Sequence, residues 1–350
     1  MRILYVAMKY DYGLPARGFS FEHENFYSTL SNMGHEILYF DFMSLYQEFG
    51  RERMNDRLWE VTITEKPDVL FCFLFGEEID RQVIRRITEK TGTLTLNWFA
   101  DDHWRFDNFS RFWAPCFQWV ITTSARAMLK YQAAGIHNVI KSQWACNHYA
   151  YRNLDLPLQY DVTFVGMAHG VRRQVIYALQ NAGIQAYAWG SGWENGRVEQ
   201  AKMVRIFNQS RINLNFSSPS AHGRGFESVI RIIEKRWSKL GKIFRQALGL
   251  LYDPLRIVHP MAQIKGRNFE IPGCGGFLLT DLAENLADYY LIGKEIACFT
   301  SLKHLIQQVR YYLSHEQERQ EITHAGYLRT IREHTYQKRF LEIFQQAGLN

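Results

Sequence analysis

Short apolar runs alternate with amphipathic stretches along the first part of the chain. The runs ILYVAM (3–8), VLFCFLF (69–75) and TLTLNWF (93–99) have the length and continuous apolar character of strands buried on both faces. Between them, stretches such as 21–33 and 81–90 carry apolar residues at helical spacing. This alternation predicts an α/β fold with a parallel, doubly wound sheet.

A polar, irregular segment then interrupts the pattern. Residues 147–160, NHYAYRNLDLPLQY, contain a proline and lack apolar periodicity, which is typical of a linker. Strand and helix patterns restart immediately after it. The sequence therefore predicts two Rossmann-like domains, 1–150 and 151–330, with a helix in 331–350 that crosses back to the first. Two such domains would face a central cleft at the carboxyl ends of their strands.

Composition narrows the class of protein. The 350 residues are 47% hydrophobic and 22% charged, which excludes a disordered or low-complexity chain. Five cysteines without a CxxC pair indicate reduced thiols. The amino terminus lacks the apolar stretch of a signal peptide, and no run is long enough to span a membrane. We expect a cytoplasmic protein, with peripheral contact to the inner face of the cell membrane left open.

Several common catalytic signatures are missing from the sequence. There is no GxGxxG after the first strand, no GxxxxGK[ST], no GxSxG and no HExxH. Hydride transfer, P-loop chemistry and the common hydrolase mechanisms therefore have no motif behind them.

The densest group of chemically useful residues lies in KGRNFEIPGCGGFLLTD, 265–281. It offers two cations, one carboxylate and a glycine turn: Lys265, Arg267, Glu270, Gly273, Gly275 and Gly276. Cations neutralise a diphosphate, a carboxylate accepts hydrogen bonds from ribose hydroxyls, and glycines let backbone N–H groups approach phosphate oxygens. The alternative is a capped helix followed by a buried strand, with Glu270 in a salt bridge.

This segment resembles the signature of the CgeB-like (spore-maturation-type) glycosyltransferases, a GT-B family. The likeness extends to NWFADDHWRF (97–106), YDVTFVGMAHGVRR (160–173), WGSGW (189–193) and HTYQKRF (334–340). The resemblance implies two Rossmann-like domains and a nucleotide-sugar donor held by the second. It also implies no metal and no cofactor, since the nucleotide-sugar is a substrate.

The resemblance also implies roles for particular donor-site residues. Related GT-B enzymes carry a Glu, seven residues, Glu motif, whose second Glu contacts the ribose and matches Glu270. The position of the first Glu, which faces the sugar, holds Ala262 here. The sugar and the stereochemical outcome therefore stay open.

Two further donor contacts are expected in the second domain. Arg172 and Arg173 follow Gly166 and the other glycine of FVGMAHG, and they match the position of a diphosphate-binding cation. Arginine is disfavoured at a helix amino terminus unless an anion is bound there. Trp193 could stack on the nucleotide base, although a tryptophan beside glycines is as often part of a core.

Asp101, Asp102 and His103 end a strand of the first domain and are the candidate catalytic residues. Paired carboxylates beside a histidine suit general-base work on an acceptor hydroxyl, because a like-charged neighbour and burial raise a carboxyl pKa. The resemblance favours contact between His103 and the donor sugar. An aspartate helix cap is the structural alternative, and a divalent metal is discounted because the phosphate-binding cations replace it.

An insertion at about 220–260 has no counterpart in the resemblance. Between 226 and 251 apolar residues recur at helical steps, and the opposite side is basic. Seven Lys or Arg minus two Glu give residues 223–252 a charge of +5, against +6 for the whole chain. The residues that would carry a membrane or partner contact are Arg231, Lys235, Trp237, Lys239, Lys242 and Arg245.

Two interpretations of the insertion remain open. A basic amphipathic helix suits an anionic membrane surface. The same pattern suits packing on its own domain or in a homodimer. A nucleic-acid partner is not expected, because a wide apolar face does not help to bind phosphates.

The sequence thus predicts a metal-independent glycosyltransferase that acts on an unidentified acceptor hydroxyl of a saccharide, glycan or protein. Two alternatives stay open: a nucleotide-sugar epimerase-like enzyme, and a non-catalytic nucleotide-sugar-binding protein.

Overall fold

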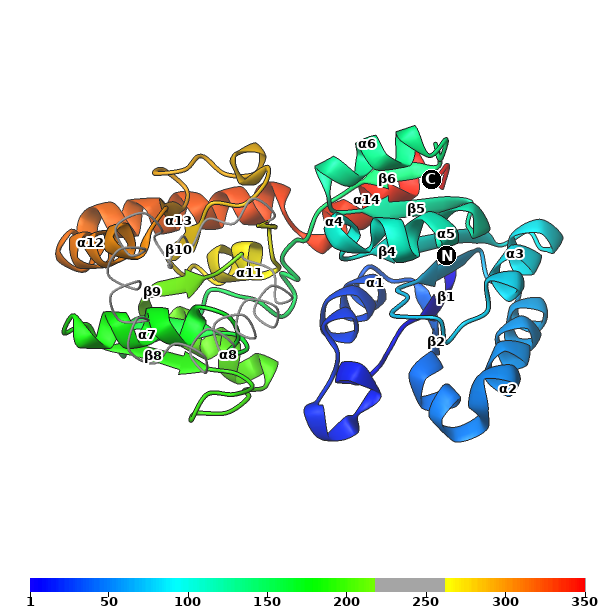
Figure 1. Ribbon diagram of the computed structural model, residues 1–350, viewed down its shortest axis with the longest axis horizontal. Helices are drawn as coiled ribbons and strands as arrows, with labels where there is room; N and C mark the ends of the chain where they lie inside the picture. The colour runs from blue at the N-terminus through cyan, green and yellow to red at the C-terminus, as the bar shows by residue number, and fades with distance from the viewer. Residues whose placement is uncertain (218–261, 350) are drawn as a thin grey trace, which may run out of the picture. The chain divides into compact units, whose positions relative to one another are not determined.

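Figure 1 shows a computed structural model of the chain, which describes residues 1–217 and 262–349. The chain divides into two compact units, Met1–Tyr149 with Glu333–Asn350, and Ala150–Arg332. The insertion at 220–260, with all six residues expected to contact a membrane or partner, lies outside the described residues.

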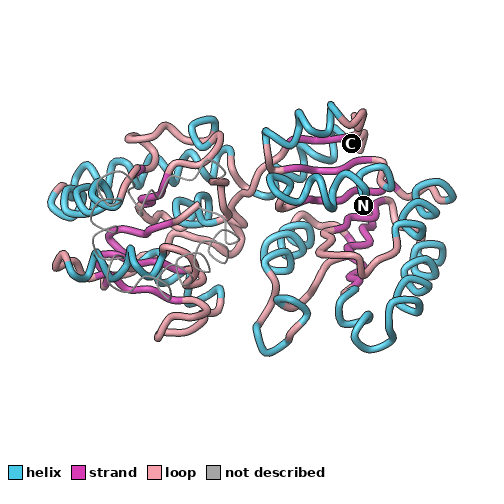
Figure 2. The backbone as a smooth tube through the Cα atoms, in the orientation of Figure 1, coloured by secondary structure: helices cyan, strands magenta, loops and turns pink. Residues whose placement is uncertain are grey.

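Unit 1 is built on a parallel sheet of six strands in the order β2-β1-β3-β4-β5-β6 (Figure 2). Its strands are β1 (Arg2–Val6), β2 (Glu36–Phe40), β3 (Val69–Cys72), β4 (Leu94–Phe99), β5 (Trp119–Thr122) and β6 (Val139–Lys141). Its helices are η1 (Asp11–Gly13), η2 (Pro15–Arg17), η3 (His23–Tyr27), α1 (Ser28–Asn32), α2 (Phe42–Glu65), α3 (Arg81–Lys90), α4 (Asp102–Arg105), η4 (Phe106–Ser110), α5 (Arg111–Trp113), η5 (Ala114–Cys116), α6 (Ala125–Ala133) and α14 (Tyr336–Gln346).

The period of two along each strand gives the unit 1 sheet two apolar faces. Leu4 and Leu70 share a core with Leu58 of α2. The other face carries an aromatic cluster, in which the Phe71 ring lies 6.0 Å from Tyr5 and 5.8 Å from Phe340 of α14. Parallel strands buried on both sides need continuous apolar sequences, which is why the runs at 3–8 and 69–75 predicted them.

The carboxyl-terminal segment belongs to unit 1 because the backbone binds it there. The Cys146 N–H donates to the His334 carbonyl at 2.9 Å, and the Tyr336 N–H donates to the Cys146 carbonyl at 3.0 Å. The Thr335 side chain then caps α14 by accepting from the Lys338 N–H.

Unit 2 contains a parallel sheet of five strands in the order β11-β10-β9-β7-β8. Its strands are β7 (Tyr160–Val165), β8 (Ala186–Trp189), β9 (Ser210–Asn215), β10 (Leu278–Asp281) and β11 (Ala297–Phe299). Its described helices are α7 (Arg172–Asn181), α8 (Gln200–Asn208), α11 (Arg267–Gly273), η7 (Leu286–Asp288), α12 (Leu302–Ser314) and α13 (Glu316–Glu333). The two doubly wound parallel sheets that the sequence predicted are confirmed.

None of the helices in the described ranges is long and apolar enough to cross a membrane.

Candidate functional site

Each sheet reverses its direction of winding at one place, and ligands of open α/β sheets bind at the carboxyl ends of the strands there. In unit 1 this switch point lies between β1 and β3, because β2 and β3 flank β1 on opposite sides. In unit 2 it lies between β7 and β9, because β8 and β9 flank β7.

Arg172 lies at the switch point of unit 2. It begins α7, and its guanidinium donates to the carbonyl of Phe216, just after β9, at 3.0 Å and to that of Met167, just after β7, at 3.1 Å. Burial lowers the pKa of Arg172 to about 10, so the side chain remains a cation at neutral pH. A half-buried positive charge thus connects the two loops that follow these strands.

The start of α11 reaches the same edge of the sheet. The Nε of Arg267 lies 3.4 Å from the carbonyl of Val165, the last residue of β7. The Asn268 side chain accepts from the Asn215 amide at the end of β9 at 3.1 Å and from the Lys265 N–H at 2.8 Å. Lys265 and Arg267 are therefore brought close to the strand ends, where the sequence analysis expected a donor site.

Glu270 is fully buried and pairs with Arg267 one turn earlier in α11. Its Oε1 atom has no hydrogen-bond partner within residues 1–217 and 262–349. The pair matches the salt bridge that the sequence left open, yet one carboxylate oxygen retains its capacity to accept. A buried acceptor without a partner is costly, which makes it a candidate contact for a ligand hydroxyl.

Sequence reasoning missed Asp281, the last residue of β10. It is fully buried, and its Oδ1 accepts from the Ser217 N–H at 2.7 Å. Burial raises the pKa of Asp281 to about 6, although Arg172 opposes that rise. The only signal in the sequence was its place at the end of an apolar run, where ligand-binding side chains often stand.

The three glycines of the 265–281 segment do not join this group. Gly275 and Gly276 precede β10 and therefore lie at its amino end, whereas Asp281 lies at its carboxyl end. A Cβ at Gly275 would come within 2.8 Å of Asn153, and one at Gly276 within 2.9 Å of Asn213. Gly273 ends α11 on the way to that turn. The expectation that these glycines cradle a phosphate is corrected. The turn that contains Gly275 and Gly276 lies at the amino end of β10, whereas ligands bind at the carboxyl ends of the strands. Both positions need glycine because a Cβ there would contact neighbouring side chains too closely.

Trp193, Gly166 and Arg173 pack against one another in the loops after β7 and β8. The indole N–H of Trp193 donates to the Gly166 carbonyl at 2.8 Å. The guanidinium of Arg173 lies 5.6 Å from the centre of the Trp193 ring and also binds the Gly192 carbonyl. These contacts match the packing interpretation of Trp193. Arg173, like Arg172, donates to a backbone carbonyl of these loops, so the diphosphate contact stays an expectation for both arginines.

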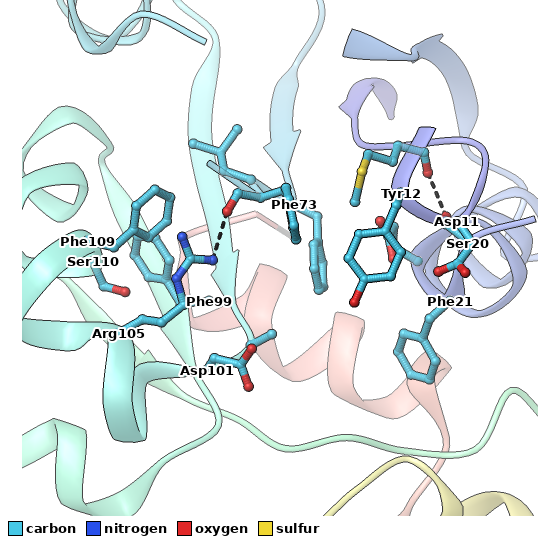
Figure 3. A pocket seen from close by; sticks show the side chains of 15 residues that line it. Asp11, Tyr12, Ser20, Phe21, Phe73, Phe99, Asp101, Arg105, Phe109 and Ser110 are labelled. Carbon is cyan, nitrogen blue, oxygen red and sulfur yellow. Dashed lines mark hydrogen bonds between the residues drawn. The ribbon is translucent and has the colours of Figure 1, made fainter. Parts of the chain in front are cut away.

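The carboxyl ends of β1, β3 and β4 surround a cavity of about 230 Å³ in unit 1 (Figure 3). Asp101 lines it two residues after the end of β4. The Asp101 carbonyl accepts from the N–H groups of Trp104 and Arg105, and these bonds form the first turn of α4. Figure 3 shows the Asp101 carboxylate below the Arg105 side chain, whose guanidinium donates to the Phe75 carbonyl at 2.7 Å. Of the three predicted catalytic residues, Asp101 is the one that lines this cavity.

Asp102 is a structural residue. It is fully buried and accepts hydrogen bonds from the Ser110 hydroxyl and, at 2.9 Å, from the Tyr131 hydroxyl. Burial raises the pKa of Asp102, and these hydrogen bonds oppose the rise. Its carboxylate thus connects α4 to η4 and α6, so the prediction of a paired catalytic carboxylate is corrected. His103 is partly buried and lies outside the residues that line the cavity.

Glu22 is a further carboxylate of the cavity, beside Asp11 and Asp101, and sequence reasoning missed it. It lies in the first turn of the helix that continues into η3. A single glutamate in a helical stretch carries no sequence signal, and only the fold brings it to the same cavity as Asp101.

The comparisons with known proteins agree with the fold. The family described as Glycosyl transferase-like matches residues 172–256 and 236–345, which include Arg172, Arg267, Glu270 and Asp281. A sucrose-phosphate synthase from Thermosynechococcus elongatus superposes with a TM-score of 0.64 at 8% identity, over 99% of this chain and 98% of that one. The chain has the GT-B fold. No curated protein matches its sequence.

Two other GT-B structures of similar length superpose on the chain. A glycosyltransferase from Rickettsia africae ESF-5 has a TM-score of 0.61 at 11% identity, covering 100% of this chain and 99% of that one. HepE from Anabaena, in complex with UDP and glucose, has a TM-score of 0.57 at 10% identity, covering 99% and 100%. At these identities the likeness shows the fold alone.

Proposed function

We propose that this GT-B chain is a glycosyltransferase of the CgeB-like group, which binds a nucleotide-sugar donor at the carboxyl edge of unit 2. One observation carries the proposal: Arg172 and the Arg267–Glu270 pair meet at the switch point of the unit that matches the glycosyltransferase family. The motifs at 97–106, 160–173 and 265–281 support the assignment to that group.

The chemistry needs these charges where the leaving group forms. Transfer breaks the bond between the anomeric carbon and the diphosphate oxygen, and a bond forms from the acceptor oxygen to the same carbon. Negative charge then develops on the diphosphate, where Arg172, Lys265 and Arg267 stabilise it without a metal. The free oxygen of Glu270 accepts from a ribose hydroxyl, and Asp101 takes the proton of the acceptor hydroxyl.

Donor binding can be tested by thermal unfolding and calorimetry of the full chain with UDP, UDP-glucose and the corresponding ADP and GDP compounds. A ligand that binds the folded state raises the melting temperature. Arg172→Ala should abolish that rise, while Arg205→Ala, which removes an exposed cation of α8, should preserve it. Equal binding by wild type and Arg172→Ala would remove the donor-site assignment.

Turnover separates transfer from the other two functions. Release of the nucleoside diphosphate that depends on an acceptor supports transfer. Conversion of the donor sugar without any acceptor would instead reveal an epimerase-like enzyme. Binding without any turnover would leave a sensor.

A further inference from the structure

The cavity of unit 1 combines flat aromatic walls with carboxylates. Tyr12, Phe21, Phe75 and Phe109 contribute rings to its lining, and Figure 3 shows Tyr12 and Phe21 on the side opposite Arg105. The Tyr12 and Phe75 rings contact each other edge to face at 5.5 Å. Aromatic walls with a few polar groups suit a ligand that presents both C–H faces and hydroxyls.

The charges of the cavity disfavour an anionic ligand. Asp11, Glu22 and Asp101 line it, and Arg105 is the one cation in its lining within the described ranges. That guanidinium is already engaged, because it donates to the Phe75 carbonyl at 2.7 Å and lies 3.9 Å from the centre of the Phe109 ring. A phosphate entering here would meet three carboxylates and one guanidinium, which already donates to the Phe75 carbonyl, so repulsion should prevail.

Glu22 is the unusual member of the lining. Its side chain is 6% exposed, and its buried Oε1 has no hydrogen-bond partner in the described part of the chain. The helix that carries it is anchored: Ser20 accepts from the His23 N–H at 3.0 Å and donates to the Met8 carbonyl at 2.6 Å, and Tyr5 donates to the Glu22 carbonyl at 3.0 Å. A fixed, buried carboxyl with one unpaired oxygen is a candidate contact for a ligand.

Two departures from regular helix geometry flank this cavity. Glu22 directly precedes the π-helical segment η3, and Phe109 and Ser110 of the lining belong to a second π-helical segment, η4. π-Helical turns are rare in proteins and occur frequently at functional sites. η4 ends on two residues of the lining, and η3 begins directly after Glu22, which supports a binding role for the cavity.

We propose that this cavity binds the acceptor as a neutral saccharide, with the Glu22 carboxylic acid donating a hydrogen bond to one acceptor hydroxyl. The inference rests on the proposed function only in calling the saccharide an acceptor. Glu22 binds and positions the sugar through its own proton. Asp101 receives the proton of the hydroxyl that attacks.

The surroundings of Glu22 keep that proton in place. Burial raises its pKa to about 8; the backbone N–H of Glu22 opposes the rise, and the carboxylates of Asp11 and Asp41 add to it. The hydroxyls of Tyr5 and Tyr39 face the same region from β1 and β2, and neither supplies a positive charge. Glu22 is therefore protonated at neutral pH and loses its donor function as the pH rises through about 8.

The test measures sugar binding to the full chain without donor, by saturation-transfer NMR and calorimetry at pH 7. The probes are methyl β-glucoside, cellobiose and maltose, each compared with glucose 6-phosphate. At least one neutral sugar should bind, and the sugar phosphate should bind about tenfold more weakly or not at all. Glu22→Ala should weaken binding about three- to tenfold, the range for one neutral hydrogen bond.

Glu22→Gln keeps a neutral donor and should retain most of the affinity. The matched control is Glu24→Gln, two residues along the same helix and outside the cavity lining, and it should bind as wild type does. Above pH 8 the wild type should lose sugar affinity, whereas Glu22→Gln should not. A purely structural role for Glu22 would not produce this difference in pH dependence. Thermal unfolding and UDP binding of each variant show whether fold and donor site are intact.

Three results would overturn the inference while donor binding persists. They are sugar phosphate binding as tight as that of the neutral sugars, no neutral sugar bound by the wild type, and unchanged sugar affinity in folded Glu22→Ala. If the wild type binds a neutral sugar but no nucleotide-sugar donor, the proposed function is wrong and the saccharide-binding inference still holds.

Discussion

The two switch points have the same topology and opposite chemistry. In unit 2 the loops after β7 and β9 share the cation Arg172, with Arg267 beside them. In unit 1 the loops after β1 and β4 bring carboxylates to an aromatic cavity. The fold thus decides where a ligand binds, and the side chains at the strand ends decide which ligand that is.

The two sites also differ in how their buried charges are balanced. Glu270 has a cation one turn away in the same helix, whereas Glu22 has no such partner among its described neighbours and keeps a proton instead. A carboxylate can only accept hydrogen bonds, whereas a protonated carboxyl can also donate one. The comparison predicts that Glu22 makes ligand binding in unit 1 sensitive to pH near 8.

Breaking the pair of unit 2 should give the largest effect. Arg267→Ala leaves the fully buried Glu270 without its partner, which should cost about 3 kcal/mol of unfolding free energy and also weaken UDP binding. Glu270→Ala should weaken UDP binding by about 1–3 kcal/mol. Urea unfolding and calorimetry measure both, with Arg205→Ala as the control. Unchanged UDP affinity in both variants would contradict the assignment of a donor site to unit 2.

Replacing the titratable carboxyl of Glu22 should change how the free energy of unfolding depends on pH. The folded-state pKa of about 8 lies above the ordinary value of 4.5, so the folded state holds the proton more tightly than the unfolded state. The contribution of Glu22 to the free energy of unfolding is therefore fully present below pH 4.5. It is lost as the pH rises toward 8, by at most about 1.4 kcal/mol per pH unit. Glu22→Gln should lack this loss, which urea titrations from pH 5 to 9 can measure. Parallel curves for the two proteins would contradict the assignment.

Asp101 and Asp102 are adjacent in unit 1, and we expect the first to act in transfer and the second to stabilise the fold. Asp101→Asn should reduce transfer severely with unfolding changed by less than about 0.5 kcal/mol. Asp102→Ala should destabilise the fold by about 1–3 kcal/mol, because the Ser110 and Tyr131 hydroxyls lose their buried acceptor. Thermal unfolding and acceptor-dependent turnover of both variants decide this. The reverse pattern would return catalysis to Asp102.

The sequence between β9 and α11 adds positive charge to unit 2, and we propose that it binds anionic membranes. Each Lys or Arg near such a surface contributes about 1 kcal/mol. The full chain should sediment with phosphatidylserine vesicles at low salt and not with phosphatidylcholine vesicles. Charge reversal at Lys235, Lys239 and Lys242 should release it and leave UDP binding intact. If the wild type binds neither kind of vesicle, packing of this segment on its own domain or on a second subunit becomes the better interpretation.

The smallest expected change is that of chelation. If Arg172, Lys265 and Arg267 neutralise the diphosphate, transfer should continue at an unchanged rate in EDTA. Loss of turnover that manganese restores would overturn the metal-free mechanism and put Asp101 at the centre of a metal site.

The sequence by itself determined the architecture and half of the chemistry. Continuous apolar runs such as 69–75 suit strands buried on both faces, so the parallel sheets could be predicted from local patterns. Arg267 and Glu270 could be found because residues three apart in one helix stay neighbours in space, and Lys265 lies two residues before that helix begins.

Only the tertiary structure decided the remaining roles. Asp101 and Asp102 are adjacent in sequence, yet the backbone turn at α4 directs one to the cavity and buries the other beneath Tyr131. Glu22 joins Asp101 only because β1 and β4 lie in one sheet with their carboxyl ends at the same edge. Burial and long-range juxtaposition set which carboxyl is charged, and neither is encoded in any local stretch of residues.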